Sequence, residues 1–355
     1  MSDNPARVKV GFTMDFRNVA NRPWREYWED CLWLMGEAEA LGFDYVMVQE
    51  HFFTADGYAP SVPVFLALLA ERTSRVRIGS YIYILPLHHA ALLAQETAVL
   101  DQLSGGRLDV TVGSGHRALE YRALGYSEKT RPSRMEEGLA VLKQAWTQSP
   151  LTFHGKYYHL DNLMIEPRPL QQPHPPLWVA ATTPLAAARA GRFGANLHGA
   201  SVGAEFYNAY FDGLAEAGVA RQDVRISNPM SITVTQQDPD VVWQRNQPLY
   251  FERWDFYRRI RTEMGDPDMA FTEEPQPEAY RDFELIGDPG LVLESIRAMF
   301  AASPLTDLVH SGPAGGLDIR GEAYDSLRLF AEKVLPEVQS WPAIRPWACD
   351  THTAA

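Results

Sequence analysis

Short apolar segments alternate with longer amphipathic segments along almost the whole chain, and no other feature constrains its fold as strongly. This alternation is typical of a parallel β-sheet that is covered by helices. The pattern predicts strands at residues 8–14, 45–49, 76–84, 108–112, 177–181, 195–197, 230–235 and 306–310. It predicts helices at residues 24–41, 62–73, 89–103, 133–147, 184–191, 204–217, 241–263, 289–301 and 324–334.

The repeated strand–helix units favour one large barrel over two domains. The chain has 355 residues, of which 46% are hydrophobic, so it can bury a large core. Barrels of the (β/α)₈ type average about 250 residues and grow by insertions. No linker rich in Pro, Gly or Ser divides the chain. We therefore expect an α/β protein with a single (β/α)₈ TIM barrel over residues 1–340, and a doubly wound sheet is the alternative.

Three segments break the alternation. Residues 150–170 have the pattern of a small hairpin that turns at Gly155. Residues 265–282 are rich in acidic residues and prolines, which predicts a mobile loop. This loop is either a lid that closes over a ligand or an acidic insertion without a role. Residues 341–355 are expected to form a C-terminal tail.

Composition excludes several classes of function. The net charge of −13 argues against binding to nucleic acid or to an anionic membrane. No apolar run reaches the roughly 18 residues that a membrane-spanning helix needs. The two cysteines, Cys31 and Cys349, have neither metal-ligand spacing nor the pattern of a disulfide framework. The amino-terminal residues are short and polar, unlike a signal peptide, and we expect a cytoplasmic protein without a metal site.

Polar side chains follow the second predicted strand directly. Glu50 and His51 come immediately after it, at the end that faces the ligand in α/β proteins. An imidazole titrates near neutrality and can exchange protons with a substrate or a cofactor. From position alone, His51 could equally hold a loop by a hydrogen bond, and Glu50 could equally be a buried structural carboxylate.

Two further segments have the chemistry of a phosphate site. Thr183 is a good helix N-cap and Pro184 suits the first helical position, so a helix begins just after the fifth strand. Such a terminus can bind phosphate through its free N–H groups, although most caps bind nothing. After the fourth strand, Gly113 and Gly115 let the backbone approach a ligand closely, with Ser114 between them.

Five motifs in order give the chain a family resemblance. They are GFDYV at 42–46, EHF at 50–52, LPLHH at 85–89, LDQLSGGRL at 100–108 and PLWVA at 176–180. Together with weaker stretches, they span the chain from about Val8 to Val338 and resemble the bacterial luciferase-like monooxygenases. The resemblance implies a (β/α)₈ barrel that binds reduced flavin mononucleotide (FMN).

The resemblance also implies roles for particular residues. His51 falls on the catalytic histidine of the family, while Phe52 stands where the family often has a second histidine. Thr182 and Thr183 fall where the family binds the flavin phosphate, and Tyr81–Ile82 falls on its non-prolyl cis peptide under the flavin ring. Ser114 and Gly115 fall on the phosphate loop. Ser114 stands where the family often has an arginine, so its hydroxyl or Arg117 would serve instead, although Arg117 could equally be a surface residue.

The implied activity is that of a two-component flavin monooxygenase. A separate flavin reductase would supply reduced FMN, and O₂ would add one oxygen atom to the substrate through a C4a-(hydro)peroxyflavin. The expected substrate is a largely apolar organic molecule, and a homodimer is the expected assembly. The expected pocket residues are Met14, Phe16, Phe52, His198 and His310.

Three other functions are left open by the sequence. A deazaflavin (F420)-dependent oxidoreductase would share the barrel and the histidine after the second strand. A non-catalytic flavin-binding protein would share the fold, although the presence of His51 argues against it. A metal-dependent barrel hydrolase would need a His-x-His motif after the first strand, where this chain has Thr13-Met14-Asp15-Phe16.

Overall fold

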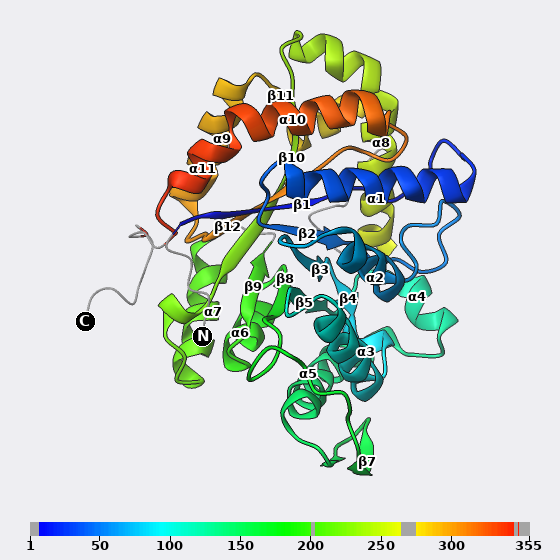
Figure 1. The fold of residues 1–355 in the computed structure, drawn as a ribbon, viewed down its shortest axis with the longest axis vertical. Coiled ribbons are helices and arrows are strands. Elements are labelled where there is room, and N and C mark those ends of the chain that lie inside the picture. Colours follow the sequence, from blue (N-terminus) through cyan, green and yellow to red (C-terminus); the bar gives the residue numbers. More distant parts are fainter. Residues whose placement is uncertain (1–6, 200–202, 264–274, 344–346, 348–355) are drawn as a thin grey trace.

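Eight parallel strands close into a barrel (Figure 1). The computed structural model describes residues 7–199, 203–263, 275–343 and 347. Around the barrel, each strand pairs with the next, and β9 pairs with β10 to close the ring. The strands are β1 Lys9–Thr13, β2 Tyr45–Val48, β3 Arg77–Ser80, β5 Leu108–Gly113, β8 Leu177–Ala181, β9 Asn196–Gly199, β10 Ile226–Val234 and β12 Asp307–Ser311. Closure confirms the predicted TIM barrel and rules out the open doubly wound sheet.

The helices pack around the outside of this barrel (Figure 1). Their inward faces form one continuous core with the outward-facing strand residues. The main helices are α1 Trp24–Ala40, α2 Val62–Arg72, α3 Ala90–Leu103, α5 Arg131–Thr147, α6 Pro184–Arg192, α7 Ala204–Glu216, α9 Pro289–Ala302 and α10 Tyr324–Lys333. Two short helices, α4 Ala118–Ala123 and α11 Leu335–Ser340, and the long helix α8 Pro239–Glu263 complete the set used below.

Ion pairs fill the barrel interior near the amino-terminal ends of the strands. Arg77 on β3 pairs with Asp109 on β5 at 3.0 Å. Arg225, directly before β10, pairs with Asp307 on β12, and the ring of Trp178 lies 4.8 Å from the Arg225 guanidinium. Buried charges are tolerated when they are paired and hydrogen-bonded, as these are. These pairs occupy the interior at the amino-terminal ends of the strands, and the carboxyl ends are the face at which (β/α)₈ barrels bind ligands.

One glycine is required by this packing. Gly11 on β1 lies opposite Tyr45 on β2, and a Cβ atom at Gly11 would lie 1.9 Å from the tyrosine ring. The Tyr45 ring, which is nearly fully buried, fills that space instead. The glycine therefore lets a large side chain occupy the interior of the barrel.

The structure describes the predicted hairpin fully and the predicted mobile loop only in part. Strands β6 Leu151–His154 and β7 His159–Leu163 form an antiparallel hairpin where one was expected. Residues 264–274 of the expected mobile loop lie outside the described residues. Its last part forms a 3₁₀ helix, η5 Pro277–Phe283, rather than a loop. The ring of Tyr280 is fully buried and lies 5.7 Å from that of Phe251, which packs this segment onto α8.

The expected C-terminal tail packs onto the barrel in its described part. Trp341 accepts a hydrogen bond from the Val8 amide through its carbonyl, and its ring lies 5.7 Å from that of Phe300. Trp347 is buried against Tyr207 on α7. These aromatic contacts hold 341–343 and 347 against the body of the protein.

Candidate functional site

His51 lies at the carboxyl end of β2 and is paired with a carboxylate. Its Nδ1 lies 3.2 Å from Oε1 of Glu120, which belongs to α4 and is fully buried. The same oxygen accepts the Phe52 amide at 2.9 Å. A carboxylate at Nδ1 favours the tautomer with the proton on that nitrogen and fixes the ring. The Nε2 atom of His51 is then left to act on a ligand.

Four aromatic side chains surround the His51 ring. Tyr58 lies 4.8 Å away between ring centroids, His116 5.6 Å, Phe256 5.7 Å and Tyr257 6.1 Å. We call these four side chains and His51 the aromatic cluster. They come from the loop after β2, the loop after β5 and helix α8. Aromatic rings on three elements exclude water from the imidazole and offer apolar surface to a ligand.

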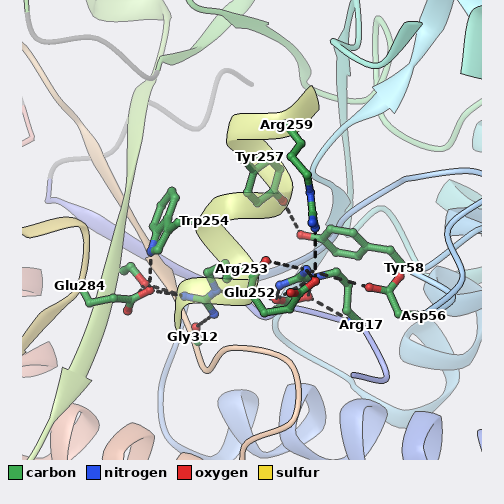
Figure 2. Close-up of polar contacts among 12 residues, drawn as sticks. Arg17, Asp56, Tyr58, Glu252, Arg253, Trp254, Tyr257, Arg259, Glu284 and Gly312 are labelled. Carbon is green, nitrogen blue, oxygen red and sulfur yellow. Dashed lines mark hydrogen bonds and ion pairs between the residues drawn. The ribbon is translucent and has the colours of Figure 1, made fainter. Parts of the chain in front are cut away.

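Helix α8 is held over the strand ends by a buried ionic network (Figure 2). Arg253 on α8 pairs with Glu284 at 3.0 Å and donates to the Gly312 carbonyl at 2.7 Å. Figure 2 shows that the indole of Trp254 points at the same carboxylate, to which it donates at 2.8 Å. The Arg253 and Glu284 side chains are almost inaccessible to solvent. Breaking a buried pair is strongly destabilising, so this network fixes the position of α8.

A second arginine lies directly against the aromatic cluster. Arg17 follows β1 and pairs with Asp15 at 2.9 Å. Its guanidinium lies 5.0 Å from the centroid of the Phe256 ring and 5.7 Å from that of Tyr58. Burial alone would lower the pKa of Arg17, but Asp15 outweighs it and the pKa is raised. The hydroxyl groups of Tyr58 and Tyr257 are hydrogen-bonded to each other next to the Arg17 guanidinium (Figure 2).

Glu50 makes structural contacts, which is one of the two roles that the sequence left open for it. Its carboxylate accepts the Ile84 amide at 2.8 Å and lies 2.9 Å from Nε2 of His88. Burial alone would lower the pKa of His88, but Glu50 outweighs it and the pKa is raised. The pair fastens the loop after β2 to the segment after β3.

The segment after β3 contains a cis peptide between Tyr81 and Ile82, at the position that the resemblance implied. The ring of Tyr81 meets that of His198 edge-on at 4.4 Å. His198 is buried inside the barrel, with Nδ1 at 2.6 Å from the Ser227 hydroxyl. Burial lowers the pKa of His198 to about 3, so this imidazole is neutral. His198 thus packs inside the barrel against the Tyr81 ring.

The glycine loop after β5 approaches the same segment. A Cβ atom at Gly113 would lie 2.2 Å from Cδ1 of Ile82, and Gly115 has a φ of +64°. The Ser114 carbonyl accepts the hydroxyl of Tyr121. Arg117 donates a hydrogen bond to the Phe52 carbonyl, so its guanidinium is bound to the loop after β2. This local contact weighs against the hypothesis that Arg117 replaces the missing phosphate arginine.

Helix α6 begins as expected. Thr183 is its N-cap and its hydroxyl accepts the Ala186 amide at 3.3 Å, with Pro184 in the first turn. Thr182 and Thr183 are exposed at the carboxyl end of β8. The free amides of such a helix start form a ready anion site.

Three of the expected pocket residues lie elsewhere. Met14 and Phe16 are buried in the main core, and the Phe16 ring packs on Phe65 of α2 at 5.2 Å. His310 is buried 4.7 Å from the ring of Phe330 on α10. The structure places Phe16 against α2 and His310 against α10, and Met14 in the main core, rather than among the rings around His51. Successive strand residues face opposite sides, and both faces of a barrel strand are buried.

Phe52 also points away from the aromatic cluster. It packs against a small group of buried side chains that includes Ile84, Leu87 and Tyr121. Its neighbour His51 turns to the other side, toward Tyr58. Phe52 thus lies outside the aromatic cluster, whereas His198 lies inside the barrel beside Tyr81.

Sequence reasoning missed several residues of this site. Glu120 gives no local signal, because its helix is short and its partner lies 69 positions away. Tyr257 is one of several aromatic residues on α8, and others of them are core: Trp243 and Tyr250 are buried and stack at 5.6 Å. The glycines before His116 mark a close backbone approach, and this was the available signal for that residue.

Comparison with known proteins identifies the family. Residues 9–306 match the model of the luciferase-like monooxygenases. The chain belongs to this family. Residues in the matched part include His51, Glu120 and both segments expected to hold a phosphate. Among solved structures, monooxygenase RslO1 from Streptomyces bottropensis superposes with a TM-score of 0.80 at 26% identity, over 93% of this chain and 99% of that one.

Relatives in this family fall into two cofactor groups. The oxygenase component of flavin-dependent trigonelline monooxygenase from Acinetobacter baylyi is 25% identical, over 77% of this chain and 80% of its own. An F420-dependent glucose-6-phosphate dehydrogenase from Segniliparus rotundus is 27% identical, over 85% and 92%. The chain also spans about half the length of two uncharacterised Sinorhizobium fredii proteins, which are 32% and 33% identical.

None of the helices in the described ranges has both the length and the apolar character that crossing a membrane requires.

Proposed function

We propose that this protein is the oxygenase of a two-component flavin monooxygenase. A separate reductase would supply reduced FMN, and one atom of O₂ would be inserted into a largely apolar organic substrate. The observation that carries this proposal is the pairing of His51 with buried Glu120 inside the aromatic cluster. An oriented imidazole in a water-poor, apolar site suits oxygenation of an organic molecule.

The residues around the glycine loop fit an FMN molecule. A side chain at Gly113 would collide with Ile82, so the loop leaves bare backbone beside the Tyr81–Ile82 peptide. The exposed start of α6, with Thr182 and Thr183, offers a phosphate site at the same end of the barrel. Tyr81, Ile82, Ser114 and Gly115 would then border the flavin ring and its ribityl chain. One phosphate site favours the mononucleotide over the dinucleotide.

Several residues of the site have a chemical role in this proposal. The bound reduced flavin would supply the electrons that activate O₂. His51 holds or donates a proton at Nε2, and Glu120 orients its ring through Nδ1. The rings of Tyr58, Phe256 and Tyr257 keep water from the reacting atoms. Arg17 and Arg253 hold these rings in place through α8 and the loop after β2.

A second candidate is an F420-dependent oxidoreductase. The observation that favours it is the F420-dependent relative that aligns over 85% of this chain. The two candidates differ in their need for O₂ and in the cofactor side chain. An F420 enzyme would transfer a hydride and leave O₂ unused.

Anaerobic titration separates these candidates. The protein is titrated with reduced FMN, reduced flavin adenine dinucleotide and reduced F420. We expect reduced FMN to bind most tightly, and tighter binding of F420 would favour the second candidate. The FMN complex is then mixed with ¹⁸O₂ and a panel of apolar organic compounds. A product that gains one ¹⁸O atom supports monooxygenation, and hydride transfer without ¹⁸O uptake contradicts it.

We also propose that the protein forms a homodimer through α2 and α3. Five apolar side chains on these neighbouring helices are 41–66% exposed: Val64, Leu68, Leu92, Val99 and Leu103. Apolar residues grouped on one face favour association with another surface. Light scattering should show a dimer in the wild type. Leu68→Lys with Leu92→Lys should give a folded monomer, and an unchanged mass would contradict this interface.

A further inference from the structure

His116 is the one member of the aromatic cluster that the proposed function has not used. It lies in the loop after β5, between His51 at 5.6 Å and Tyr257 at 5.9 Å from ring to ring. Its Nε2 atom is shielded from solvent, and among the residues described by the structure it has no hydrogen-bond partner. A buried polar atom without a partner is costly, and native structures rarely keep one without a reason.

The surroundings of His116 determine its charge. Burial, together with His51 and the guanidinium groups of Arg261, Arg131 and Arg117, lowers its pKa to about 3. The imidazole is therefore neutral at any pH near 7 and carries one N–H group. The Nδ1 atom of His51, by contrast, has a carboxylate partner in Glu120. The two imidazoles are thus suited to different tasks.

The sign of the surrounding charge limits the ligand group that His116 can meet. Three arginines contribute positive potential there, which repels a cationic group and favours an electron-rich oxygen. The rings of Tyr257 and His51 both lie next to His116 and 6.1 Å from each other, so they offer aromatic surface to a flat or apolar body beside that oxygen. A carbonyl or a carboxylate attached to an aromatic or cyclic body meets both conditions.

We propose that His116 provides the second imidazole of this site and that its Nε2–H donates a hydrogen bond to a carbonyl or carboxylate oxygen of the organic substrate. The inference rests on the proposed function, since it names the class of substrate which that site would take. His116 would thereby decide how the substrate is oriented toward His51.

Three probes test this role. They are acetophenone, benzoate and ethylbenzene, which share a ring and differ in carrying a neutral carbonyl, a carboxylate or no oxygen. The histidine ring nitrogens of the full-length protein are labelled with ¹⁵N, and His116→Gln identifies the His116 resonances. We expect Nε2 of His116 to shift on addition of acetophenone or benzoate and to stay unchanged with ethylbenzene. The two oxygenated probes distinguish a neutral carbonyl from a carboxylate.

Matched variants separate hydrogen bonding from packing. His116→Phe keeps the ring and removes the nitrogen, so affinity for the responding oxygenated probe should fall about fivefold to tenfold. His116→Gln keeps an N–H donor and should retain most of that affinity. Binding of ethylbenzene should change in neither variant. His154→Phe, on the hairpin where the side chain is 62% exposed, is the control and should bind all three probes as the wild type does.

Two results would overturn the inference. One is that none of the probes shifts the Nε2 resonance, and the other is that His116→Phe weakens ethylbenzene as much as the oxygenated probes. Titration of the same variants with reduced FMN distinguishes this failure from that of the proposed function. If the probes bind in a His116-dependent way but FMN does not bind, only the cofactor assignment is contradicted. If FMN binds but no probe shifts the His116 resonance, only the role of His116 is contradicted.

Discussion

The imidazole of His51 and the carboxylate of Glu120 lie 3.2 Å apart although 69 positions separate them in the sequence. The first residue follows β2 and the second belongs to α4, after β5. The fold therefore assembles this pair only when two separate strand ends come together. The pair has the form of a general acid–base group with its orienting carboxylate.

Removing Glu120 should impair turnover through His51. His51→Ala should lower turnover by roughly 10²–10⁴-fold, as expected for a positioned acid or base. Glu120→Ala should lower it by about 10–100-fold, the range seen when an outer-shell partner is lost. Single-turnover mixing of the reduced FMN complex with O₂ measures both. The double variant should be little worse than His51→Ala, and fully additive losses would show that the two residues act independently.

Thr183 should contribute to binding of the flavin phosphate. Loss of an N-cap hydroxyl typically costs about 0.5–2 kcal/mol, and we expect Thr183→Ala to weaken FMN binding by this amount. Riboflavin has no phosphate, so its affinity should hardly change. Thr183→Ser retains the hydroxyl and serves as the control. Equal weakening of both flavins would point to a folding defect and contradict the phosphate role.

His310 should make the protein sensitive to acid. Burial lowers its pKa to about 3, whereas the unfolded chain binds a proton near pH 6.5. Because the unfolded state then holds more protons, stability falls as the pH drops below about 6.5. At pH 5 this one group lowers the free energy of unfolding by about 2 kcal/mol relative to neutral pH.

Replacing His310 should remove that part of the acid sensitivity. His310→Leu fits the apolar surroundings of Phe12, Phe43 and Phe330. Denaturant unfolding at pH 5 and pH 7.5 should show a smaller difference in the variant than in the wild type. The exposed His154→Gln is the control and should leave the difference unchanged. An unaltered difference in His310→Leu would refute the assignment.

Arg253 should be required for the position of α8. Arg253→Met leaves Glu284 buried without its charge partner, which should cost about 3–5 kcal/mol of stability. Amide hydrogen exchange should rise most in α8. Arg259→Ala removes a surface cation from the same helix, where the side chain is 53% exposed, and should have little effect. Equal exchange in both variants would show that the buried pair does not anchor the helix.

Much of the barrel could be predicted because its strands are runs of apolar residues. The strand after α7 shows where this approach fails. It was expected at 230–235, but β10 begins at Ile226, since Ser227 and Asn228 belong to the strand and interrupt the apolar run. Ser227 faces the barrel interior, where it meets His198. Polar residues that line a barrel look like a loop in the sequence.

The candidate site was predictable where local geometry defines a role. The N-cap Thr183 is such a case, because the cap and the following proline are adjacent in the chain. Glu120 and Tyr257 join the site through contacts between distant segments. A local sequence pattern cannot show such contacts. Both faces of a barrel strand are apolar, so alternation could not show that His310 packs against Phe330 on α10.

Arg253 and Tyr257 stand four residues apart on α8, so one face of a single helical turn carries both the anchor and a wall of the aromatic cluster. The His51–Glu120 pair, by contrast, is built from the loops at the ends of β2 and β5. The proposed reacting pair and one wall of the aromatic cluster therefore lie on separate parts of the chain. Under the proposed function, substitutions on α8 that keep Arg253 would change the aromatic surface offered to a substrate and leave His51 and Glu120 in place.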